Sequence, residues 1–327
     1  MYLPQIKFSL WADFIEREFI DTGLKRLIEE GIVNGATSNP AIFKNAILNS
    51  PAYRNQIESL KNHAPKAKYE AVAVYDIQKA ADVLRPLYDK GDDGYVSIEV
   101  DPHLCFDALG TIEEGRRLHR TIGRPNVMIK VPATDAGYEA METLTSEGIA
   151  VNATLVFSKD QAIACANSFA RGREKGSVYV DTVISIFVSR LDRAIDAALE
   201  AKGIQSALSG IYNAADIYTA VEGMEVPRCR VLFASTGVKG GGLRPSYYVD
   251  ELLAANSVNT TPIETIEAFV AHGDKEPKLP IDSKVIEAHF EKVAAAGIDM
   301  ENVFAQLMEE GLDAFKTAFD EILATLE

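Results

Sequence analysis

The chain has few cysteines, and their placement gives no sign of a covalent or metal-bound framework. Cys105, Cys165 and Cys229 are odd in number, widely separated and without the C-x-x-C spacing of disulfide-rich scaffolds and zinc sites. The five histidines also lack metal-ligand spacing. We therefore expect no metal, and the simplest location is a reducing compartment, the cytoplasm.

Positive charge is also scarce. The 33 lysines and arginines are outnumbered by 48 aspartates and glutamates, so the formal net charge is -15. A protein that holds nucleic acid or an anionic membrane normally presents a basic surface. We therefore expect neither partner, and an anionic substrate would need a local basic pocket.

Several other common signatures are missing. No hydrophobic run approaches a membrane span, and residues 1–14 lack the basic, apolar and small-residue regions of a secretion signal. No G-x-S-x-G elbow, P-loop or dinucleotide fingerprint stands between a strand and a helix. No repeat of solenoid length is visible. These absences favour a soluble cytoplasmic protein without a nucleotide-binding motif.

What is present is a regular alternation of short apolar segments and helical segments. The expected strands are residues 8–12, 32–37, 95–100, 127–131, 149–156, 178–187, 230–234 and 257–261. No low-complexity linker divides the chain, so we expect one α/β domain over residues 1–327. The alternation predicts a closed eight-stranded (β/α)8 TIM barrel with extra helices and the C-terminal helix packed on it. An open doubly wound sheet is the alternative.

Lys130 lies within the apolar segment NVMIKVPAT, residues 126–134, which Pro132 interrupts. A lysine with apolar neighbours loses hydration, which favours the neutral amine, and a neutral amine is a nucleophile toward carbonyls. The alternative is that Lys130 ends a strand and extends its ammonium into water, as most lysines do.

Polar residues mark the ends of seven successive strands, where the active site of such a barrel lies. They are Asp13, Asn39, Glu99, Lys130, Asn152 with Thr154, Ser185 and Ser235. Glu99 stands in an apolar alternation and needs a partner, so it forms either a catalytic or a structural ion pair with Lys130. Asp13 alone fits a helix cap equally well. Asn152 and Thr154 share a strand face, where they either bind substrate or complete the core.

Two cations follow the sixth and seventh strands. Arg190 stands near the start of a helix, where backbone donors favour anions, and Lys239 lies in the glycine-rich STGVKGGG. Each alone is more simply a solvated surface residue. Phosphate sites in these barrels often lie beside the last two strands, so in an acidic chain the pair indicates phosphate binding.

These strand ends carry the motifs ATSNP, SIEVDP, MIKVPAT, VNATLVFS, ISIFVSRLD and FASTGVK. With them, the sequence resembles the longer bacterial branch of the transaldolase family over essentially its whole length. The resemblance implies a class I aldolase-type barrel that needs no external cofactor. It also implies transfer of a dihydroxyacetone unit from fructose 6-phosphate or sedoheptulose 7-phosphate to glyceraldehyde 3-phosphate or erythrose 4-phosphate, in the non-oxidative pentose phosphate pathway.

The same resemblance implies roles for the residues at the strand ends. Those implied for catalysis are the Schiff-base lysine Lys130, the acid-base groups Asp13 and Glu99, and Thr154 beside the catalytic water. Those implied for the dihydroxyacetone hydroxyls are Asn39, Asn152 and Ser185, and those for phosphate are Arg190 and Ser235. Better-known members have an arginine shortly after the matching serine, whereas here the nearby cation is Lys239.

Phe187 separates two activities within the resemblance. Related fructose 6-phosphate aldolases, a shorter-chain branch, have a tyrosine at the matching position. A phenol there can hydrogen-bond the catalytic water and help hydrolyse the iminium, which a phenyl ring cannot do. We therefore expect a transferase, with the aldolase as the alternative.

Two hypotheses come from other classes of protein. A pyridoxal phosphate enzyme also uses a lysine, but it would absorb near the visible edge. A non-catalytic barrel serving as an acidic binding scaffold would not need Lys130. Either a monomer or a homodimer is compatible with the sequence.

Overall fold

Eight parallel strands close into a barrel in chain order, and β8 pairs with β1 to complete it. The computed structural model describes residues 1–240 and 242–327. The strands are β1 (Ser9–Ala12), β2 (Gly35–Ala36), β3 (Tyr95–Glu99), β4 (Val127–Pro132), β5 (Val151–Val156), β6 (Thr182–Phe187), β7 (Cys229–Ala234) and β8 (Ser257–Thr261). The predicted closed barrel is confirmed, and the open doubly wound sheet is wrong.

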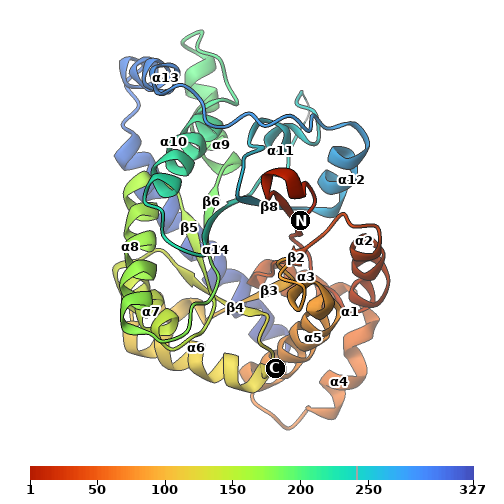
Figure 1. The fold of residues 1–327 in the computed structure, drawn as a ribbon. Helices are drawn as coiled ribbons and strands as arrows, with labels where there is room; N and C mark the ends of the chain where they lie inside the picture. Colours follow the sequence, from red (N-terminus) through yellow and green to blue (C-terminus); the bar gives the residue numbers. More distant parts are fainter. Residues whose placement is uncertain (241) are drawn as a thin grey trace.

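Helices surround the strands on all sides (Figure 1). They are α1 (Arg17–Phe19), α2 (Lys25–Glu29), α3 (Pro40–Asn49), α4 (Arg54–Ser59), α5 (Pro65–Tyr88), α6 (Ala108–Ile122), α7 (Asp135–Ser146), α8 (Lys159–Lys175), α9 (Ser189–Glu200), α10 (Ser209–Gly223), α11 (Tyr247–Glu251), α12 (Ile263–His272), α13 (Ser283–Ala295) and α14 (Met300–Thr325). Shorter 3-10 or π turns are η1 (Pro4–Ile6), η2 (Ile20–Leu24), η3 (Pro51–Tyr53) and η4 (Pro102–Leu104). None of the described helices has the length and hydrophobicity that a membrane crossing requires.

Local sequence signals set several helix ends. Ser158 Oγ accepts from the backbone N–H of Gln161, and the Gln161 side chain accepts from the backbone N–H of Ser158, which forms a capping box at the start of α8. Gly123 ends α6 with φ 62°, in the left-handed region that suits glycine. Ser158 therefore fixes the start of α8.

Two strands, β2 and β6, are each four residues shorter than the sequence pattern predicts. β2 has only Gly35–Ala36, and Gly35 lies so close to the indole of Trp11 that a Cβ there would be 2.6 Å from the ring. β6 begins at Thr182, because Val178 and Tyr179 before it are both 57% exposed. The apolar pattern alone therefore predicts too great a length for both strands.

The C-terminal helix α14 lies across the C-terminal end of the barrel and contacts α3, α5, α9 and β5. It passes behind the strands in the view of Figure 1. Gly311 permits the close approach, since a Cβ there would lie 2.9 Å from Leu155 on β5. Lys68 Nζ donates to the carbonyl of Leu326 at 2.6 Å and holds the far end of the helix. The predicted packing of this helix is confirmed.

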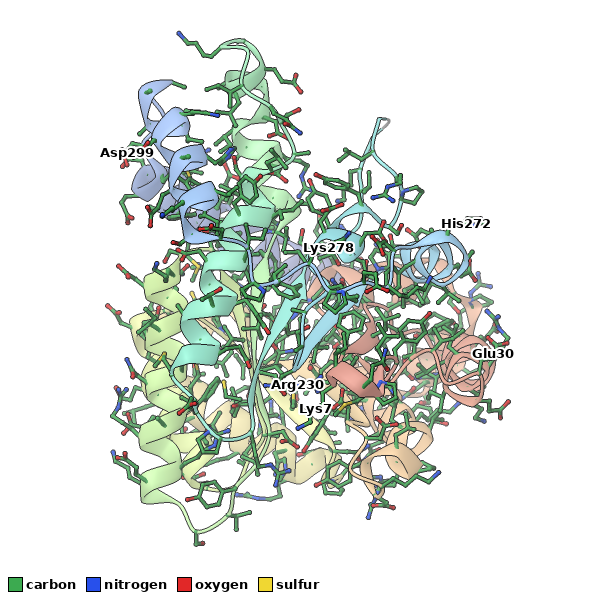
Figure 2. All side chains as sticks on the ribbon, turned by 45° about the horizontal axis from the view of Figure 1, so that its top comes forward. Lys7, Glu30, Arg230, His272, Lys278 and Asp299 are labelled. Carbon is green, nitrogen blue, oxygen red and sulfur yellow. The ribbon has the colours of Figure 1, made fainter. Side chains whose placement is uncertain are left out.

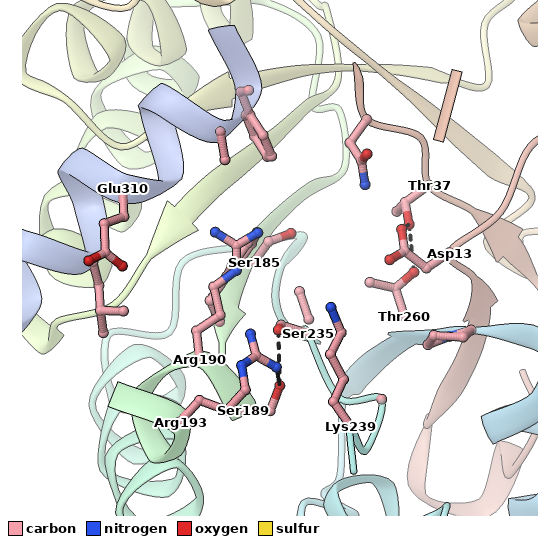
Figure 3. A pocket seen from close by; sticks show the side chains of 18 of the residues that line it. Asp13, Thr37, Ser185, Ser189, Arg190, Arg193, Ser235, Lys239, Thr260 and Glu310 are labelled. Carbon is pink, nitrogen blue, oxygen red and sulfur yellow. Dashed lines mark hydrogen bonds between the residues drawn. The ribbon is translucent and has the colours of Figure 1, made fainter. Parts of the chain in front are cut away.

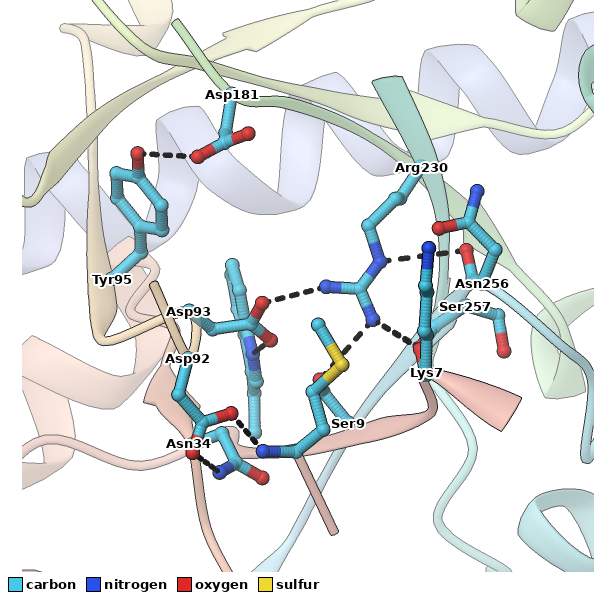
Figure 4. A network of polar contacts seen from close by, with 12 residues as sticks. Lys7, Ser9, Asn34, Asp92, Asp93, Tyr95, Asp181, Arg230, Asn256 and Ser257 are labelled. Atoms are coloured by element: carbon cyan, nitrogen blue, oxygen red, sulfur yellow. Dashed lines mark hydrogen bonds and ion pairs between the residues drawn. The ribbon is translucent and has the colours of Figure 1, made fainter. Parts of the chain in front are cut away.

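The opposite end of the barrel is closed by a polar network (Figure 4). Arg230 donates to Asp93 Oδ1 at 2.7 Å, and the indole of Trp11 donates to Asp93 Oδ2 at 3.0 Å. The same guanidinium donates to the carbonyl of Lys7 at 2.8 Å. Figure 2 shows Lys7 and Arg230 together at this end, while charged residues such as Glu30 lie on the outside. This end of the barrel is therefore filled by polar side chains.

Candidate active site

A cavity of about 600 Å³ lies at the C-terminal ends of the strands, against α14 (Figure 3). The predicted site residues that line it are Asp13, Asn39, Lys130, Ser185, Arg190, Ser235 and Lys239. Those that do not line it are Glu99, Asn152 and Thr154. The strand register pairs Lys130 with Glu99 on one side and with Asn152 on the other. The structure therefore brings the predicted residues together. Most line the cavity, and Glu99 and Asn152 lie on the strands next to Lys130.

Lys130 is buried, with 5% of its surface exposed. Its Nζ donates to the carbonyl of Ser38 at 3.2 Å and lies 5.8 Å from the centre of the Phe315 ring on α14. The alternative of a strand-end lysine extended into water is therefore wrong. Because the same side chain lines the cavity, a substrate carbonyl can reach its nitrogen.

Glu99 lies next to Lys130, with its Oε2 3.8 Å from the lysine Nζ. Burial raises the pKa of Glu99 to about 7, against the opposing effect of the Lys130 and Arg190 charges. Its Oε2 has no hydrogen-bond partner within the described residues. A carboxyl group with this pKa can both give and accept a proton near neutral pH. The distance fits both the catalytic and the structural hypothesis for the pair.

A chain of polar side chains crosses the barrel interior beside Lys130. Ser185 Oγ donates to Asn152 Oδ1 at 2.6 Å, and Asn152 Nδ2 donates to Ser97 Oγ at 3.1 Å. These bonds fix the orientation of the buried amide. The two residues of the predicted pair therefore differ. Asn152 is fixed by hydrogen bonds, whereas Thr154 Oγ1 is buried without a hydrogen-bond partner in the described chain.

A backbone irregularity follows Thr154. The register between β5 and β6 shifts between Ala153 and Val156, and Leu155 has φ 57°. This left-handed conformation is strained for a branched residue, and such bulges often occur next to active sites, where they re-aim a side chain. Here the bulge lets Leu155 contact α14 while Thr154 stays inside the barrel.

Asp13 ends β1 and is oriented by threonines. Thr37 Oγ1 donates to Asp13 Oδ1 at 2.7 Å and lies 2.6 Å from Thr260 Oγ1. The next helix is capped by Glu16, whose side chain accepts from the backbone N–H of Phe19. The helix-cap alternative for Asp13 is therefore wrong, and its carboxylate faces the cavity (Figure 3).

Asn39 has two uses for its side chain. Its Oδ1 accepts from the backbone N–H of Ile42 at 3.0 Å and caps α3. The amide nitrogen is then left to donate toward the cavity that Asn39 lines. Asn39 and Pro40 thus form the start of a helix.

Arg190 lies in the first turn of α9, as the sequence predicts. Its guanidinium lies 4.9 Å from the centre of the Phe187 ring. Burial lowers the pKa of Arg190, and the neighbouring Arg193 cation adds to the lowering. Ser235 and the exposed Lys239 approach from the loop after β7. The basic pocket that an anionic substrate needs is therefore present in this acidic chain.

Sequence reasoning missed several residues that complete the site. They are Thr37, Ser38, Ser97, Ser189, Arg193, Thr260, Glu310 and Phe315. Arg193 stands three residues after Arg190, so helical spacing places both on one face. Ser97 precedes Glu99 by the two-residue strand period. Phe315 had no such signal, because only the tertiary packing of α14 brings it over Lys130.

No group of three or more histidine, cysteine, aspartate or glutamate side chains is placed to hold a metal ion in residues 1–240 and 242–327. The residues around Lys130 instead supply an amine, two carboxyl groups and several hydroxyls. This set suits carbonyl chemistry at the lysine nitrogen.

Comparison with known proteins gives a consistent result. Residues 10–326 match the model of the Transaldolase/Fructose-6-phosphate aldolase family. A transaldolase of Helicobacter pylori is 43% identical over 320 residues, which is 98% of this chain and 99% of that protein. A transaldolase of Campylobacter jejuni is 44% identical over 330 residues, again 98% of this chain and 99% of that protein. The chain belongs to the transaldolase/fructose-6-phosphate aldolase family.

Proposed function

We propose that the chain is a transaldolase that forms a Schiff base at Lys130. It transfers a dihydroxyacetone unit from fructose 6-phosphate or sedoheptulose 7-phosphate to an aldose phosphate. The observation that carries this proposal is a buried lysine that opens onto a cavity lined by Asp13 and lies 3.8 Å from Glu99. The curated relatives named transaldolase support the same reaction.

In the first half of the reaction, Lys130 Nζ attacks the ketone carbon of the donor. The resulting carbinolamine loses water, and Glu99 supplies the proton through a water molecule beside Thr154. The iminium withdraws electrons from the bond between C3 and C4, while Asp13 accepts the proton of the C4 hydroxyl. That bond then breaks, and an aldose phosphate leaves.

In the second half, the three-carbon enamine that remains on Lys130 adds to the aldehyde of the acceptor. Asp13 returns its proton to the new hydroxyl group. Water then hydrolyses the iminium with Glu99 as its base, and the new ketose phosphate leaves. The raised pKa of Glu99, about 7, suits a group that donates a proton in one step and accepts one in another.

The remaining site residues position the substrate. Asn39, Asn152 and Ser185 hold the dihydroxyacetone hydroxyls, and Asn152 acts with its amide already oriented by Ser185 and Ser97. Arg190 and Ser235 bind the phosphate. Holding the phosphate there places the ketone against the lysine.

Phe187 supports transfer over simple cleavage. The centre of its ring lies 5.5 Å from the centre of the Phe157 ring and 4.9 Å from the central carbon of the Arg190 guanidinium. It offers no hydroxyl to a water molecule at the iminium, so the dihydroxyacetone adduct persists until an acceptor arrives.

We further propose one domain over residues 1–327, acting as a monomer or homodimer in the cytoplasm.

The proposal is tested by incubating the protein with fructose 6-phosphate and erythrose 4-phosphate and measuring sedoheptulose 7-phosphate. Lys130→Met should lose the activity by several orders of magnitude. Lys159→Met, a matched change of an exposed lysine on α8, should keep it. Wild-type protein that releases dihydroxyacetone as fast as it transfers it would be an aldolase, and protein that does neither would contradict the proposal. Colourless active protein would exclude a pyridoxal phosphate enzyme.

A further inference from the structure

Arg193 enters the cavity from the same helix as Arg190, one turn further along α9 (Figure 3). Its NH1 donates to Ser189 Oγ at 3.1 Å. Ser189 Oγ in turn lies 3.1 Å from Ser235 Oγ, across the gap between α9 and the loop after β7. Two guanidinium groups and two hydroxyl groups therefore converge on one side of the cavity.

The two guanidinium groups interact unfavourably with each other. The charge of Arg193 adds to the burial that lowers the pKa of Arg190, so the cations are close enough to repel. In the described part of the chain, Arg193 makes its one side-chain hydrogen bond to Ser189 and forms no ion pair. An anion bound between them would offset this repulsion, and phosphate oxygens match the fork of each guanidinium.

The loop after β7 offers a weaker second cation. Lys239 is exposed and reaches the cavity on a flexible four-carbon stem. Gly237, between it and Ser235, has no side chain, and a Cβ there would lie 3.1 Å from Pro262. Arg193 stands on a rigid helix and is already oriented by a hydroxyl, so less conformational entropy is lost when it binds an anion.

We propose that Arg193, rather than Lys239, is the second phosphate-binding cation, and that Ser189 positions it beside Ser235. This inference rests on the proposed function and deepens it. It assigns the phosphate of the sugar phosphate to Arg190, Arg193 and Ser235, and it makes α9 the element that selects phosphorylated substrates.

The test compares donors with and without phosphate, fructose 6-phosphate and fructose, with unphosphorylated erythrose as acceptor throughout, so that both donors yield sedoheptulose as the measured product. Arg193→Ala should lower kcat/KM for fructose 6-phosphate about 10- to 100-fold, chiefly through KM, because a charge-assisted hydrogen bond is lost. The value for fructose should fall far less. Arg193→Lys should lie between, and Ser189→Ala should give a smaller loss with the same preference.

Two matched variants control for charge and position. Arg120→Ala removes an exposed arginine of α6 outside the cavity, so it should leave both donors unaffected. Lys239→Ala should change kcat/KM for fructose 6-phosphate less than Arg193→Ala does. A larger loss in Lys239→Ala, or an equal loss for both donors in Arg193→Ala, would overturn the proposal.

Calorimetric titration with inorganic phosphate tests the site without turnover. The dissociation constant should rise about 10-fold or more in Arg193→Ala, while the thermal unfolding transition stays intact. Unchanged phosphate binding would overturn the inference. If the wild-type chain binds phosphate through Arg193 but transfers no three-carbon unit, the proposed function fails and the phosphate site stands.

Discussion

Glu99 and Lys130 are register partners on β3 and β4, and their charged ends lie 3.8 Å apart with both side chains buried. The distance is too long for a direct hydrogen bond. The lysine donates to the Ser38 carbonyl instead, so neither group is locked to the other. One water molecule can bridge such a pair and pass a proton between the two groups.

The pKa of Glu99 predicts a pH dependence of stability. It is raised from 4.5 to about 7 in the folded protein, so the folded state binds this proton more tightly than the unfolded state. The free energy of unfolding should therefore fall as pH rises from about 5 to 7, by up to about 3 kcal/mol from this group. Urea unfolding of wild type and Glu99→Gln at pH 5 and 8 measures it. The glutamine variant should lose the part of the change in unfolding free energy that comes from Glu99. An unchanged pH dependence would show that Glu99 does not titrate between pH 5 and 8.

Asp13 should act in bond cleavage and not in forming the Schiff base. Asp13→Ala should still give a borohydride-trapped adduct with dihydroxyacetone, while cleavage of fructose 6-phosphate falls about 10²- to 10⁴-fold. Thr37→Val removes the hydroxyl that donates to Asp13 and should give a smaller loss. Failure of Asp13→Ala to form the adduct would show that the carboxylate acts earlier.

Phe187→Tyr should convert part of the transfer into hydrolysis. The new phenol would lie at the edge of the cavity and could hydrogen-bond the water that attacks the iminium. Dihydroxyacetone released from fructose 6-phosphate without acceptor should rise relative to transfer. Phe187→Leu, which removes the ring without adding a hydroxyl, should not raise it. If the tyrosine variant releases and transfers dihydroxyacetone in the same ratio as the wild type, Phe187 has only a packing role.

The network at the closed end of the barrel should contribute stability and not activity (Figure 4). The Arg230 and Asp93 side chains are 14% and 9% exposed, so Asp93→Ala leaves a largely buried cation without its carboxylate partner. The cost should be about 3–5 kcal/mol in urea unfolding. Arg228→Ala, which breaks an ion pair whose arginine is 51% exposed, should cost about 1 kcal/mol or less. Similar costs for both would contradict the role of burial.

Much of the fold could be predicted because strand ends and helix caps are local signals. β8 was predicted with the observed bounds, and Asp13 and Arg190 were placed at the end of a strand and the start of a helix. β2 lies within the predicted residues 32–37, but its short length could not be predicted, because it depends on pairing with β1 and β3, which are separate segments of the chain. Such contacts between distant segments cannot be inferred from apolar composition.

The candidate site divides in the same way. Residues at strand ends, such as Lys130 and Ser185, could be found because the barrel collects them at one end. Ser38 could not, since it acts through its backbone carbonyl, which every residue has. Phe315 and Glu310 reach the cavity only because α14 folds back over the barrel from the far end of the chain. Their roles depend on a long-range contact that no local pattern encodes.

Lys130 should carry the covalent intermediate of the transfer reaction. Incubation with fructose 6-phosphate and borohydride, followed by proteolysis and mass spectrometry, locates the reduced adduct on the chain. We expect a single three-carbon dihydroxyacetone adduct on Lys130, absent in Lys130→Met although that variant still folds. An adduct on another lysine, or undiminished trapping in Lys130→Met, would contradict it.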